Sequence, residues 1–383
     1  MKNLFPTKIL VATPLFPPEI GGPATYAKIL SEELPKRGIE TEILVFREVR
    51  SLPKIVRHFA YFLRCIGKGR DCGLIYALDP VSVGFPAWLA AKLTGKRFVL
   101  KVAGDFAWEM YNQRPTTNDQ RPDTLEKFQK RKYDWLTEIR RFVERFVASK
   151  AEKVIVPSEY LKKIILMWGV PAEKIKVIYN AFSPPRLLFD KETARQALKI
   201  GGDEKIIISA GRLVPWKGFG ALIESFSGVL RQFPNSRLFI AGDGPDASSL
   251  KLKSKNEKLE ENVVFLGQLK QAELHRYIVA TDAFVLNTGY EGLSHLLLEV
   301  MALGTPIITT AVGGNPEVLK GGQSAIFVAY NDKVALTGVI LEILSNPEKA
   351  NTLVAEAKKS LAKFTLETMI TSTISVLKKT YVE

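Results

Sequence analysis

Two glutamates, Glu291 and Glu299, stand eight positions apart around the predicted start of a helix. Ser294 lies between them, and its hydroxyl suits a helix N-cap because it can accept a hydrogen bond from an unpaired amide of the first turn. The amides of Gly292, Leu293 and Ser294 then lie at the positive end of a helix dipole, which favours a phosphate. Glu299, one to two turns into the helix, can accept two hydroxyl hydrogen bonds of the kind that a ribose offers.

The apolar run 296–301 predicts a buried helix that stops at Gly304, with Pro306 just beyond. Taken alone, the same pattern also fits a surface glutamate followed by an ordinary amphipathic helix. The other motifs of the chain decide between the two interpretations.

A second motif, Gly211-Arg212-Leu213-Val214-Pro215-Trp216-Lys217-Gly218, follows an expected strand over 205–209. Arg212 offers a planar fork of hydrogen-bond donors and Lys217 a compact charge. Together they can neutralise a diphosphate as it leaves, and each contributes on the order of 3 kcal/mol to such a transition state. The alternative is a basic surface turn without a ligand.

Two glycine turns follow expected strands. Gly21 and Gly22 precede a helix that we expect to open near Thr25, and such a turn lets backbone amides approach a phosphate closely. Gly242 begins the turn 242–245, which we interpret chiefly as structural because glycines allow a tight turn. The family resemblance described below implies that this turn also lines a nucleotide pocket.

Asp105 follows the expected strand 97–102, and the family resemblance described below makes it the candidate for contacting a sugar or acceptor hydroxyl. By the same resemblance, Trp108 and Tyr111 are candidates for stacking on a sugar face or bordering the acceptor, with ordinary packing as the alternative for Trp108. The histidines (His58, His275 and His295) show neither metal nor catalytic-base spacing, so no metal is predicted. The two cysteines, Cys65 and Cys72, are interpreted as inert.

Short apolar strands alternate with helical patterns along the whole chain, which predicts parallel sheets covered by helices on both faces. The expected strands are 8–12, 41–46, 74–77, 97–102, 153–156 and 176–179, then 205–209, 236–241, 262–266, 283–286, 305–309 and 325–328. Two such sets predict an α/β protein of two doubly wound domains, 1–185 and 186–363, joined near a proline-rich linker. Ligands of such sheets bind beyond the carboxyl ends of the strands.

The segment 291–302 (EGLSHLLLEVMA) resembles the Glu-(seven residues)-Glu signature of retaining glycosyltransferases of the GT-B fold, family 4. The segments 211–218 (GRLVPWKG), 304–308 (GTPII) and 313–317 (GGNPE) also match that family. The resemblance is strong over 205–330 and looser over 8–180. Position 105 departs from it, because many relatives carry a His-Asp or similar polar group there and no histidine is near.

The resemblance implies two Rossmann-like domains across a cleft, with the last helix, 364–383, returning to the first domain. It implies that Glu291 binds the donor sugar, Glu299 the ribose, and Arg212 with Lys217 the diphosphate. Gly21 and Gly22 would touch the donor phosphate from the other domain, and Ser158 and Asn180 match cleft-facing positions, although Ser158 also suits a helix N-cap.

The implied reaction moves a hexosyl group from a UDP-, GDP- or ADP-sugar to an acceptor hydroxyl with retention. No side chain is assigned as a nucleophile, and the leaving phosphate takes the acceptor proton from the front face. The reaction needs no further cofactor and no metal.

The net charge of +14 is uneven: residues 1–190 carry +12 and residues 191–383 carry +2. An excess in one half indicates an anionic partner for that half, such as a lipid-linked acceptor, an anionic membrane or nucleic acid. Two basic amphipathic segments, 54–70 and 128–150, could lie on an anionic membrane. The alternative is that both are helices docked on the sheet with solvated basic faces.

The preferred interpretation is a cytoplasmic glycosyltransferase, peripherally associated with the cytoplasmic face of a membrane. It would act on a lipid-linked or cell-envelope glycan, without nucleic acid as a partner. Apolar residues 9–12 are read as a first strand and not as a signal peptide, because prolines follow and a small-residue cleavage site does not.

A rival enzyme is a sugar phosphorylase or epimerase of the same fold. The rival from another class is a basic membrane- or nucleic-acid-binding protein with an inactive nucleotide-sugar pocket.

Overall fold

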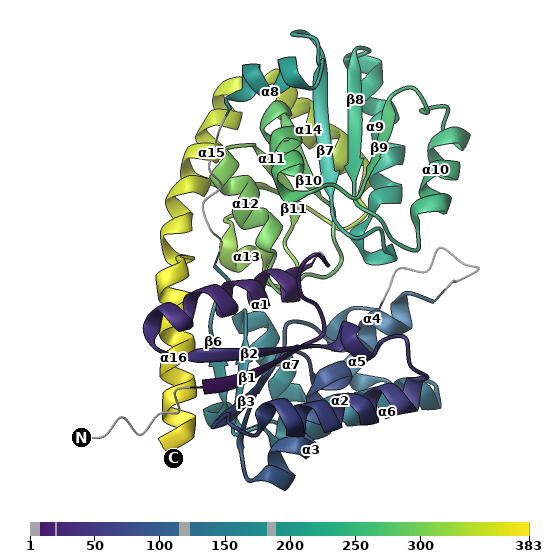
Figure 1. Ribbon diagram of the computed structural model, residues 1–383. Helices are drawn as coiled ribbons and strands as arrows, with labels where there is room; N and C mark the ends of the chain where they lie inside the picture. The colour runs from purple at the N-terminus through teal and green to yellow at the C-terminus, as the bar shows by residue number, and fades with distance from the viewer. Residues whose placement is uncertain (1–7, 20, 115–122, 182–188, 383) are drawn as a thin grey trace. The chain divides into compact units, whose positions relative to one another are not determined.

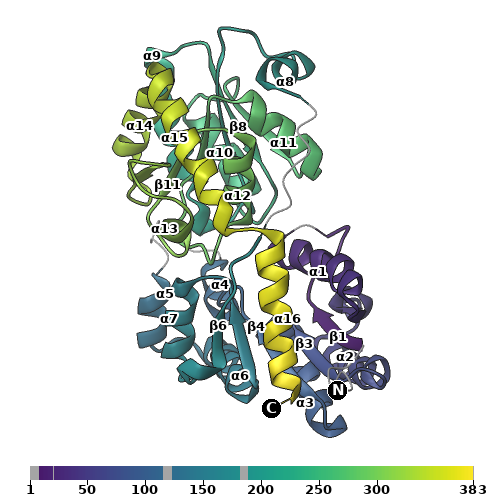
Figure 2. The ribbon, with the colours of Figure 1, turned by 90° about the vertical axis from the view of Figure 1, so that its left-hand side faces the viewer.

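The computed structural model describes residues 8–19, 21–114, 123–181 and 189–382 and divides the chain into two compact units. The first unit comprises Met1–Tyr111, Leu125–Ala181 and Leu366–Glu383, and the second comprises Asn112–Thr124 and Phe182–Thr365. Figure 1 follows the chain from one end to the other by colour, and Figure 2 gives a second view. The expected polar loop 112–123 and the proline-rich linker lie largely outside the described residues.

The first unit is built on a parallel sheet of six described strands in the order β2-β1-β3-β4-β5-β6. Its strands are β1 (Lys8–Thr13), β2 (Glu40–Val45), β3 (Leu74–Ala77), β4 (Arg97–Lys101), β5 (Lys153–Val156) and β6 (Ile175–Val177). Its helices are α1 (Gly22–Glu33), α2 (Lys54–Gly69), α3 (Phe85–Thr94), α4 (Phe106–Asn112), α5 (Leu125–Lys130), α6 (Trp135–Lys150), α7 (Glu159–Met167) and α16 (Leu366–Val382). The strand order reverses between β1 and β3.

Helices cover both faces of this sheet because its central strands, such as β3 and β5, are buried on both sides. On one face, Tyr26 of α1 and Met369 of α16 pack with strand residues such as Val11 and Val99. Tyr26 also shares a buried hydrogen-bond cluster with Tyr76 and Thr373. Right-handed crossovers place α2, α3 and α6 on the opposite face. The C-terminal helix is therefore part of the core of the first unit.

The second unit is built on another parallel sheet of six described strands, in the order β12-β11-β10-β7-β8-β9. Its strands are β7 (Lys205–Ala210), β8 (Ser236–Ala241), β9 (Val263–Gly267), β10 (Ala283–Leu286), β11 (Ile307–Thr310) and β12 (Ile326–Val328). Its helices are α8 (Lys191–Ala197), α9 (Phe219–Gln232), α10 (Ala247–Asn256), α11 (Gln271–Ala280), α12 (His295–Leu303), α13 (Asn315–Val318), α14 (Lys333–Ser345) and α15 (Pro347–Ser360). The strand order reverses between β7 and β10.

The sequence predicts the strands well. Each expected strand appears, with both ends within two residues of the prediction. Two helix predictions need correction. Helix α1 begins at Gly22 and not near Thr25, because Pro23 suits the first turn of a helix. The expected segment 128–150 is two helices, since the chain leaves α5 at Lys130 and Asp134 caps a new helix through the amide of Thr137.

Candidate active site

The carboxyl ends of β7 and β10 lie side by side at the point where the strand order of the second sheet reverses. Open α/β sheets bind their ligands at such a switch point. The loop after β7 carries Arg212 and Lys217, and the loop after β10 carries Glu291. The fold therefore brings the two strongest sequence motifs to the same edge of one sheet.

The two loops are joined by hydrogen bonds. The carbonyl oxygen of Trp216 accepts hydrogen bonds from the amide of Gly289 at 2.7 Å and from the hydroxyl of Thr288 at 3.2 Å. The buried Asn287 donates to the carbonyl of Gly218 at 2.9 Å. These bonds fix the position of the loop after β7 relative to the loop after β10.

Glycines permit still closer backbone contacts at this edge. Gly313, in the loop after β11, has φ +57°, and a Cβ there would overlap the carbonyl oxygen of Glu291. Its neighbour Gly314 donates to the same carbonyl at 2.9 Å. Gly242 likewise touches the backbone of Gly211, and both have positive φ. Gly211 and Gly242 therefore have structural roles that larger residues would not fill.

Lys217 and Glu291 form an ion pair across the two loops, with 2.5 Å between Nζ and Oε2. Their side chains are only 13% and 16% exposed. A pair so largely withdrawn from water is costly to break by removing one partner, because the other charge is then left unpaired. A ligand that replaces either partner must bring a charge or a set of hydrogen bonds of its own.

Glu299 lies in α12 and is held from α11. Gln271 Nε2 donates to Glu299 Oε1 at 3.0 Å, and His275 Nε2 lies 3.0 Å from Glu299 Oε2. The Glu299 side chain is 14% exposed. Each carboxylate oxygen can accept more than one hydrogen bond, so this arrangement orients the carboxylate and leaves it able to accept from a ligand.

The start of α12 is as the sequence predicts. The Ser294 hydroxyl accepts a hydrogen bond from the amide of Leu297 at 3.3 Å, which confirms the N-cap. The helix ends at Gly304, in the left-handed conformation with φ 82°. Gly292 and Leu293 precede the cap, and Leu293 is buried. The amides at this helix start are the ones that we expect to meet a phosphate.

Arg212 is exposed, in contrast to Lys217. Its Nη2 donates to the side-chain oxygen of Gln113 at 3.0 Å. A guanidinium that is solvated on its remaining sides can reorient toward an incoming diphosphate at small cost.

In the first unit, Gly21 is the N-cap of α1 with φ 147°, a conformation that suits glycine. Its carbonyl accepts from the amide of Thr25 at 3.0 Å, and Gly22 is the first helical residue. The glycine turn thus lies at the carboxyl end of β1, beside the reversal of strand order in this sheet.

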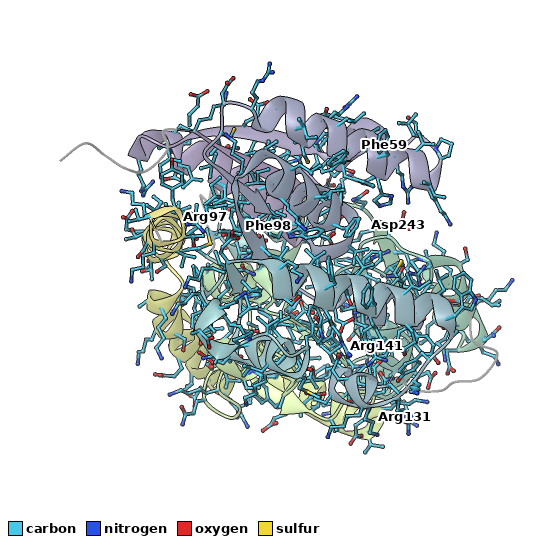
Figure 3. The ribbon with its side chains drawn as sticks, turned by 90° about the horizontal axis from the view of Figure 1, so that it is seen from below. Phe59, Arg97, Phe98, Arg131, Arg141 and Asp243 are labelled. Carbon is cyan, nitrogen blue, oxygen red and sulfur yellow. The ribbon has the colours of Figure 1, made fainter. Side chains whose placement is uncertain are left out.

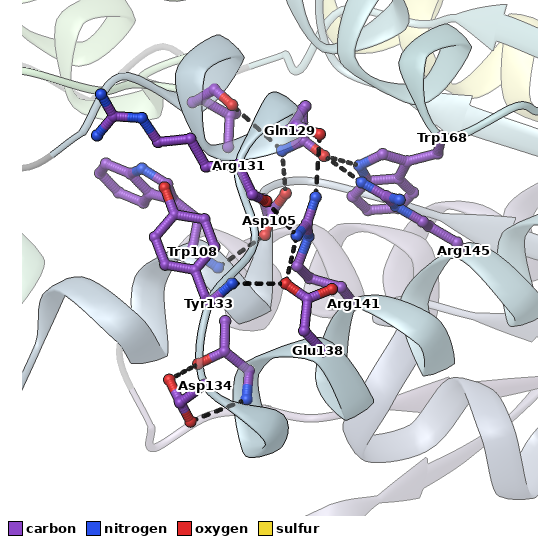
Figure 4. A network of polar contacts seen from close by, with 12 residues as sticks. Asp105, Trp108, Gln129, Arg131, Tyr133, Asp134, Glu138, Arg141, Arg145 and Trp168 are labelled. Carbon is purple, nitrogen blue, oxygen red and sulfur yellow. Dashed lines mark hydrogen bonds and ion pairs between the residues drawn. The ribbon is translucent and has the colours of Figure 1, made fainter.

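Asp105 lies in a buried polar network between α4, α5 and α6, shown in Figure 4. Its Oδ1 accepts from the amide of Trp108 at 2.8 Å, and its Oδ2 accepts from Gln129 Nε2 at 2.9 Å. The Gln129 oxygen in turn accepts from Arg145 and from the indole of Trp168. Asp105 is 1% exposed, so in this structure its carboxylate meets protein groups and not solvent.

Two carboxyls of this network are buried together. Burial raises the pKa of the Asp105 carboxyl, against the hydrogen bonds from Trp108 and Gln129. Burial, followed by the nearby charge of Asp105, raises the pKa of the Glu144 carboxyl well above its usual range. Arg141 crosses the network and donates to the carbonyls of Arg131 and Gln129, at 2.8 and 3.0 Å.

The remaining candidate site residues of the first unit mostly pack against other protein groups. Trp108 is 1% exposed, which matches the packing alternative. Tyr111 stacks edge-on against Tyr133, with ring centroids 4.6 Å apart. Ser158 accepts from the amide of Leu161 at 3.1 Å, as a helix N-cap does. The Asn180 side-chain oxygen is buried and has no hydrogen-bond partner within the described residues.

The histidines and cysteines do not gather into a metal site. Within the described residues, no group of three or more His, Cys, Asp or Glu is placed to hold a metal ion. Both cysteines are free thiols, and burial raises the pKa of Cys65 to about 12 and that of Cys72 to about 11. Thiols with pKa values this high are weak nucleophiles at neutral pH.

Sequence reasoning missed the residues that hold the site together. Gln271 and His275 precede Glu299 by 28 and 24 positions, and no local motif joins them to it. Asn287 was also missed, although its place directly after a buried strand at the switch point is a usable signal.

Lys101, the last residue of β4, is a buried lysine of the first unit. Its Nζ lies 4.0 Å from the Tyr26 ring centroid.

Two family models together match most of the chain. Glycosyltransferase Family 4 matches residues 20–186, and Glycosyl transferases group 1 matches residues 190–360. The first match covers the first sheet from α1 onward, and the second covers both motif loops of the second sheet.

Relatives with curated names are similar over part of their length. An uncharacterized glycosyltransferase of Methanocaldococcus jannaschii is 29% identical over 233 residues, which is 59% of this chain and 60% of the relative. N-acetyl-alpha-D-glucosaminyl L-malate synthase of Bacillus anthracis is 27% identical over half of each chain. Alpha-monoglucosyldiacylglycerol synthase of Streptococcus pneumoniae is 29% identical over 53% of this chain and 47% of the relative. The chain thus spans about half to three fifths of the length of these relatives.

Solved structures match nearly the whole chain. Sucrose-phosphate synthase from Thermosynechococcus elongatus superposes with a TM-score of 0.82 at 20% identity, covering 98% of this chain and 99% of that one. HepE of Anabaena, in complex with UDP and glucose, superposes with a TM-score of 0.77 at 18% identity, covering 97% and 99%. These likenesses show the fold, which is GT-B.

Proposed function

The chain belongs to the group 1 glycosyltransferases of family 4, and from this premise we propose that it transfers a sugar, with retention, from a nucleoside diphosphate sugar to an acceptor hydroxyl. The observation that carries the proposal is the Lys217–Glu291 ion pair at the switch point of the second sheet. It joins a cation suited to a diphosphate and a carboxylate suited to sugar hydroxyls in one largely buried pair.

In the proposed complex, the diphosphate lies against Lys217, Arg212 and the amides that begin α12. Lys217 exchanges its carboxylate partner for a phosphate oxygen, which frees Glu291 to accept hydrogen bonds from the donor sugar. Negative charge on the phosphate grows as the bond to the sugar breaks. Cations already fixed at that position stabilise the transition state more than the ground state.

Glu299 takes the ribose hydroxyls in this proposal. Its two protein partners, Gln271 and His275, use one hydrogen bond on each carboxylate oxygen and so fix its orientation before the ribose arrives. A carboxylate oriented in advance loses less side-chain freedom when the ligand binds.

The chemical step exchanges one bond to the anomeric carbon for another. The bond between that carbon and the leaving phosphate oxygen breaks, and the acceptor oxygen bonds to the same face. The acceptor proton passes to the leaving phosphate, so no side chain of this chain is assigned as nucleophile or base. Residue Asp105 supports the first unit through its network in this scheme, and a direct contact with an acceptor stays a prediction.

We place the acceptor on the first unit and propose that it is a lipid-linked or cell-envelope glycan. Residues 1–190 carry nearly all of the net positive charge, which suits an acceptor with phosphate or another anionic group. Two relatives carry a lipid in their names. One is the alpha-monoglucosyldiacylglycerol synthase described above, and the other is a GDP-mannose-dependent phosphatidylinositol monomannoside mannosyltransferase of Mycolicibacterium smegmatis. No described helix has the length and apolar character needed to cross a bilayer.

A thermal-shift screen of UDP, GDP, ADP and their sugars tests the donor site. Saturating ligand raises the unfolding midpoint of a protein that binds it only when folded. We expect one base to raise the midpoint of the wild type and of Glu260→Ala, an exposed control in the same unit. The rise should be lost in Glu299→Ala. A wild type that responds to no nucleotide contradicts the proposal and favours a binding protein with an inactive pocket.

A further inference from the structure

Helix α6 of the first unit buries polar residues and exposes large apolar ones, which is the reverse of the usual arrangement in a surface helix. Thr137, Arg141 and Glu144, at positions i, i+4 and i+7, are buried. Two residues away in each case, Trp135, Ile139 and Phe142 are 74%, 50% and 67% exposed. A shift of two residues is a rotation of about 200° at 3.6 residues per turn. The polar stripe thus faces the interior of the unit, where its partners lie in α4, in α5 and in the chain after α5. The aromatic stripe faces outward.

The buried stripe fixes this orientation. Arg141 donates to Glu138 Oε1 at 2.6 Å and to two backbone carbonyls (Figure 4). Glu144 accepts from the amide of Ala107 at 3.0 Å. Turning α6 to bury its aromatic stripe would break these hydrogen bonds and leave the amide of Ala107 and the carbonyls of Gln129 and Arg131 without their partners. Each polar group left unsatisfied inside the unit costs about 1–3 kcal/mol. The outward aromatic stripe is therefore a lasting feature of the folded unit.

Helix α2 repeats the pattern. Tyr61 and Cys65 are fully buried, and the Tyr61 hydroxyl donates to the carbonyl of Leu44 at 2.8 Å. Two residues before each of them, Phe59 and Leu63 are 60% and 50% exposed, and Ile55, one turn earlier, is 86% exposed. Figure 3 marks Phe59 on α2 and Arg141 on α6.

Helix α3 lies between α2 and α6 and contacts both (Figure 2). Phe85 and Trp88 of α3 join Phe146 of α6, with the Trp88 and Phe146 rings 4.9 Å apart and perpendicular. Because all three helices cover the same face of the sheet, their outward stripes face away from it together. We call these helices the three-helix layer. Eleven of the 16 large apolar side chains that are exposed in the described residues belong to it or to the turn before it.

The charge of the three-helix layer limits the kinds of partner that can bind its exposed surface. The segment 54–70 has five Lys or Arg and no Asp or Glu. Lys92 lies over the Trp88 ring and Lys150 over the Phe146 ring, with Nζ 5.6 and 5.5 Å from the ring centroids. The acids of α6, Glu138 and Glu144, lie on its network side and pair there. Arg64 and Lys68 of the segment form ion pairs with Glu48 and Glu42. The exposed surface thus combines apolar stripes with an excess of cations over acids.

We propose that the three-helix layer docks on an anionic lipid bilayer, with Phe59, Trp135 and Phe142 inserted among the acyl chains and the cations among the headgroups. Aromatic and aliphatic side chains bordered by Lys and Arg fit the boundary between acyl chains and anionic headgroups. A second copy of the chain would bring the same positive charge to the same face. Nucleic acid offers no apolar surface that would cover the stripes.

This docking extends the proposed function, since it would present a lipid-linked acceptor to the unit that we assign to the acceptor. It can be tested separately, because vesicle binding needs no nucleotide and nucleotide binding needs no vesicle. A chain that binds vesicles but no nucleotide would contradict only the proposed function, and the reverse result would contradict only the docking.

The test is co-sedimentation of the full chain with phosphatidylcholine vesicles, with and without 30% phosphatidylglycerol. We expect binding to the anionic vesicles, weaker binding to the neutral ones, and a roughly tenfold or greater loss of partitioning in the double variant Phe59→Glu, Phe142→Glu. Val334→Glu is the matched control, because Val334 lies in the second unit and is 84% exposed. The double variant must keep the wild-type unfolding midpoint and nucleotide-induced shift, so that loss of binding is not loss of fold.

Three results would overturn the proposal. The first is a wild type that sediments with neither vesicle, and the second is equal binding to both vesicles or equal binding by the double variant. The third is a wild-type dimer in light scattering that the double variant abolishes, which would assign the layer to a second copy. As a direct probe, brominated lipids should quench Trp135 fluorescence, and Trp135→Phe should lose most of that quenching.

Discussion

The two units carry their functional information in different forms. In the second unit the information is local: a few residues at short spacing, Arg212 with Lys217 and Glu291 with Glu299, meet at one edge of a sheet. In the first unit it is spread over three helices and appears only when the folded surface is seen. A diphosphate and a ribose require particular groups at particular points, whereas a bilayer requires only an apolar surface with cations around it.

The contrast extends to tolerance of change. The loops of the second unit touch through glycines and share a buried ion pair, so most changes there should reduce activity. The outward stripes of the first unit are exposed, so changes there should alter binding to a surface and leave the fold intact. The predictions below test this difference.

The largest effect is expected from Lys217→Ala. Removing this cation takes away the group that we propose to bind the leaving phosphate. It also leaves the Glu291 carboxylate without its ion-pair partner. We expect kcat to fall about 10²–10³-fold, the usual effect of losing one such donor. Steady-state kinetics of nucleoside diphosphate release measures it, with Lys251→Ala on α10 as an exposed control. An unchanged kcat would show that Lys217 takes no part in the chemical step.

A glycine pair tests how tightly the second unit is built. Gly313 and Gly322 both have positive φ, so alanine at either position is strained by about 1 kcal/mol or more. Only at Gly313 would the added Cβ overlap the carbonyl of Glu291, whereas nothing lies within 4 Å at Gly322. We therefore expect Gly313→Ala to cost several kcal/mol and to abolish the nucleotide-induced shift. Equal urea midpoints for the two variants would contradict the close packing of these loops.

His275→Ala tests whether Glu299 needs to be held. Removal of one hydrogen bond to a charged group should raise the KM for the nucleotide sugar roughly tenfold and leave kcat nearly unchanged. His275→Gln keeps an N–H group and should restore part of the affinity. His58→Ala, in the first unit, is the control. A loss confined to kcat would show that His275 acts otherwise than by positioning Glu299.

Sequence and structure agree best where the chemistry is local. The N-cap at Ser294, the end of α12 at Gly304 and each strand follow from neighbouring residues. The partners of Glu299 do not, because α11 reaches it only through the fold. The same holds for Asp105, whose place after β4 predicts an edge position but whose burial depends on Gln129, 24 residues later.

Helix α6 shows a second limit of sequence analysis. The periodicity of 135–146 separates an aromatic stripe from a polar one, but it does not say which stripe faces the sheet. The general expectation is that the apolar stripe does. Here Arg141 and Glu144 find partners inside the unit, and the stripe of Trp135 and Phe142 is left outside.

The smallest effect is expected in the interior of the first unit. Burial lowers the pKa of the Lys101 amine to about 7, against about 10.4 for an unfolded lysine. Between these values the unfolded chain binds more protons, so the free energy of unfolding should rise with pH from about 7 to about 10. Lys101→Met should therefore raise the unfolding midpoint by a few degrees at pH 7, with the gain shrinking toward pH 10. Lys176→Met, an exposed lysine of the same sheet, should show no such trend.

The most direct test of the central claim is a crystal structure with the nucleoside diphosphate sugar that the thermal-shift screen selects. We predict the diphosphate beside Lys217 and Arg212, the ribose on Glu299, and a Lys217–Glu291 ion pair that has parted or become shared with the ligand. A nucleotide elsewhere would contradict the account. One such place is the cavity of about 310 Å³ at the opposite edge of the same sheet, lined by Lys205, Asp282 and Pro306 among others.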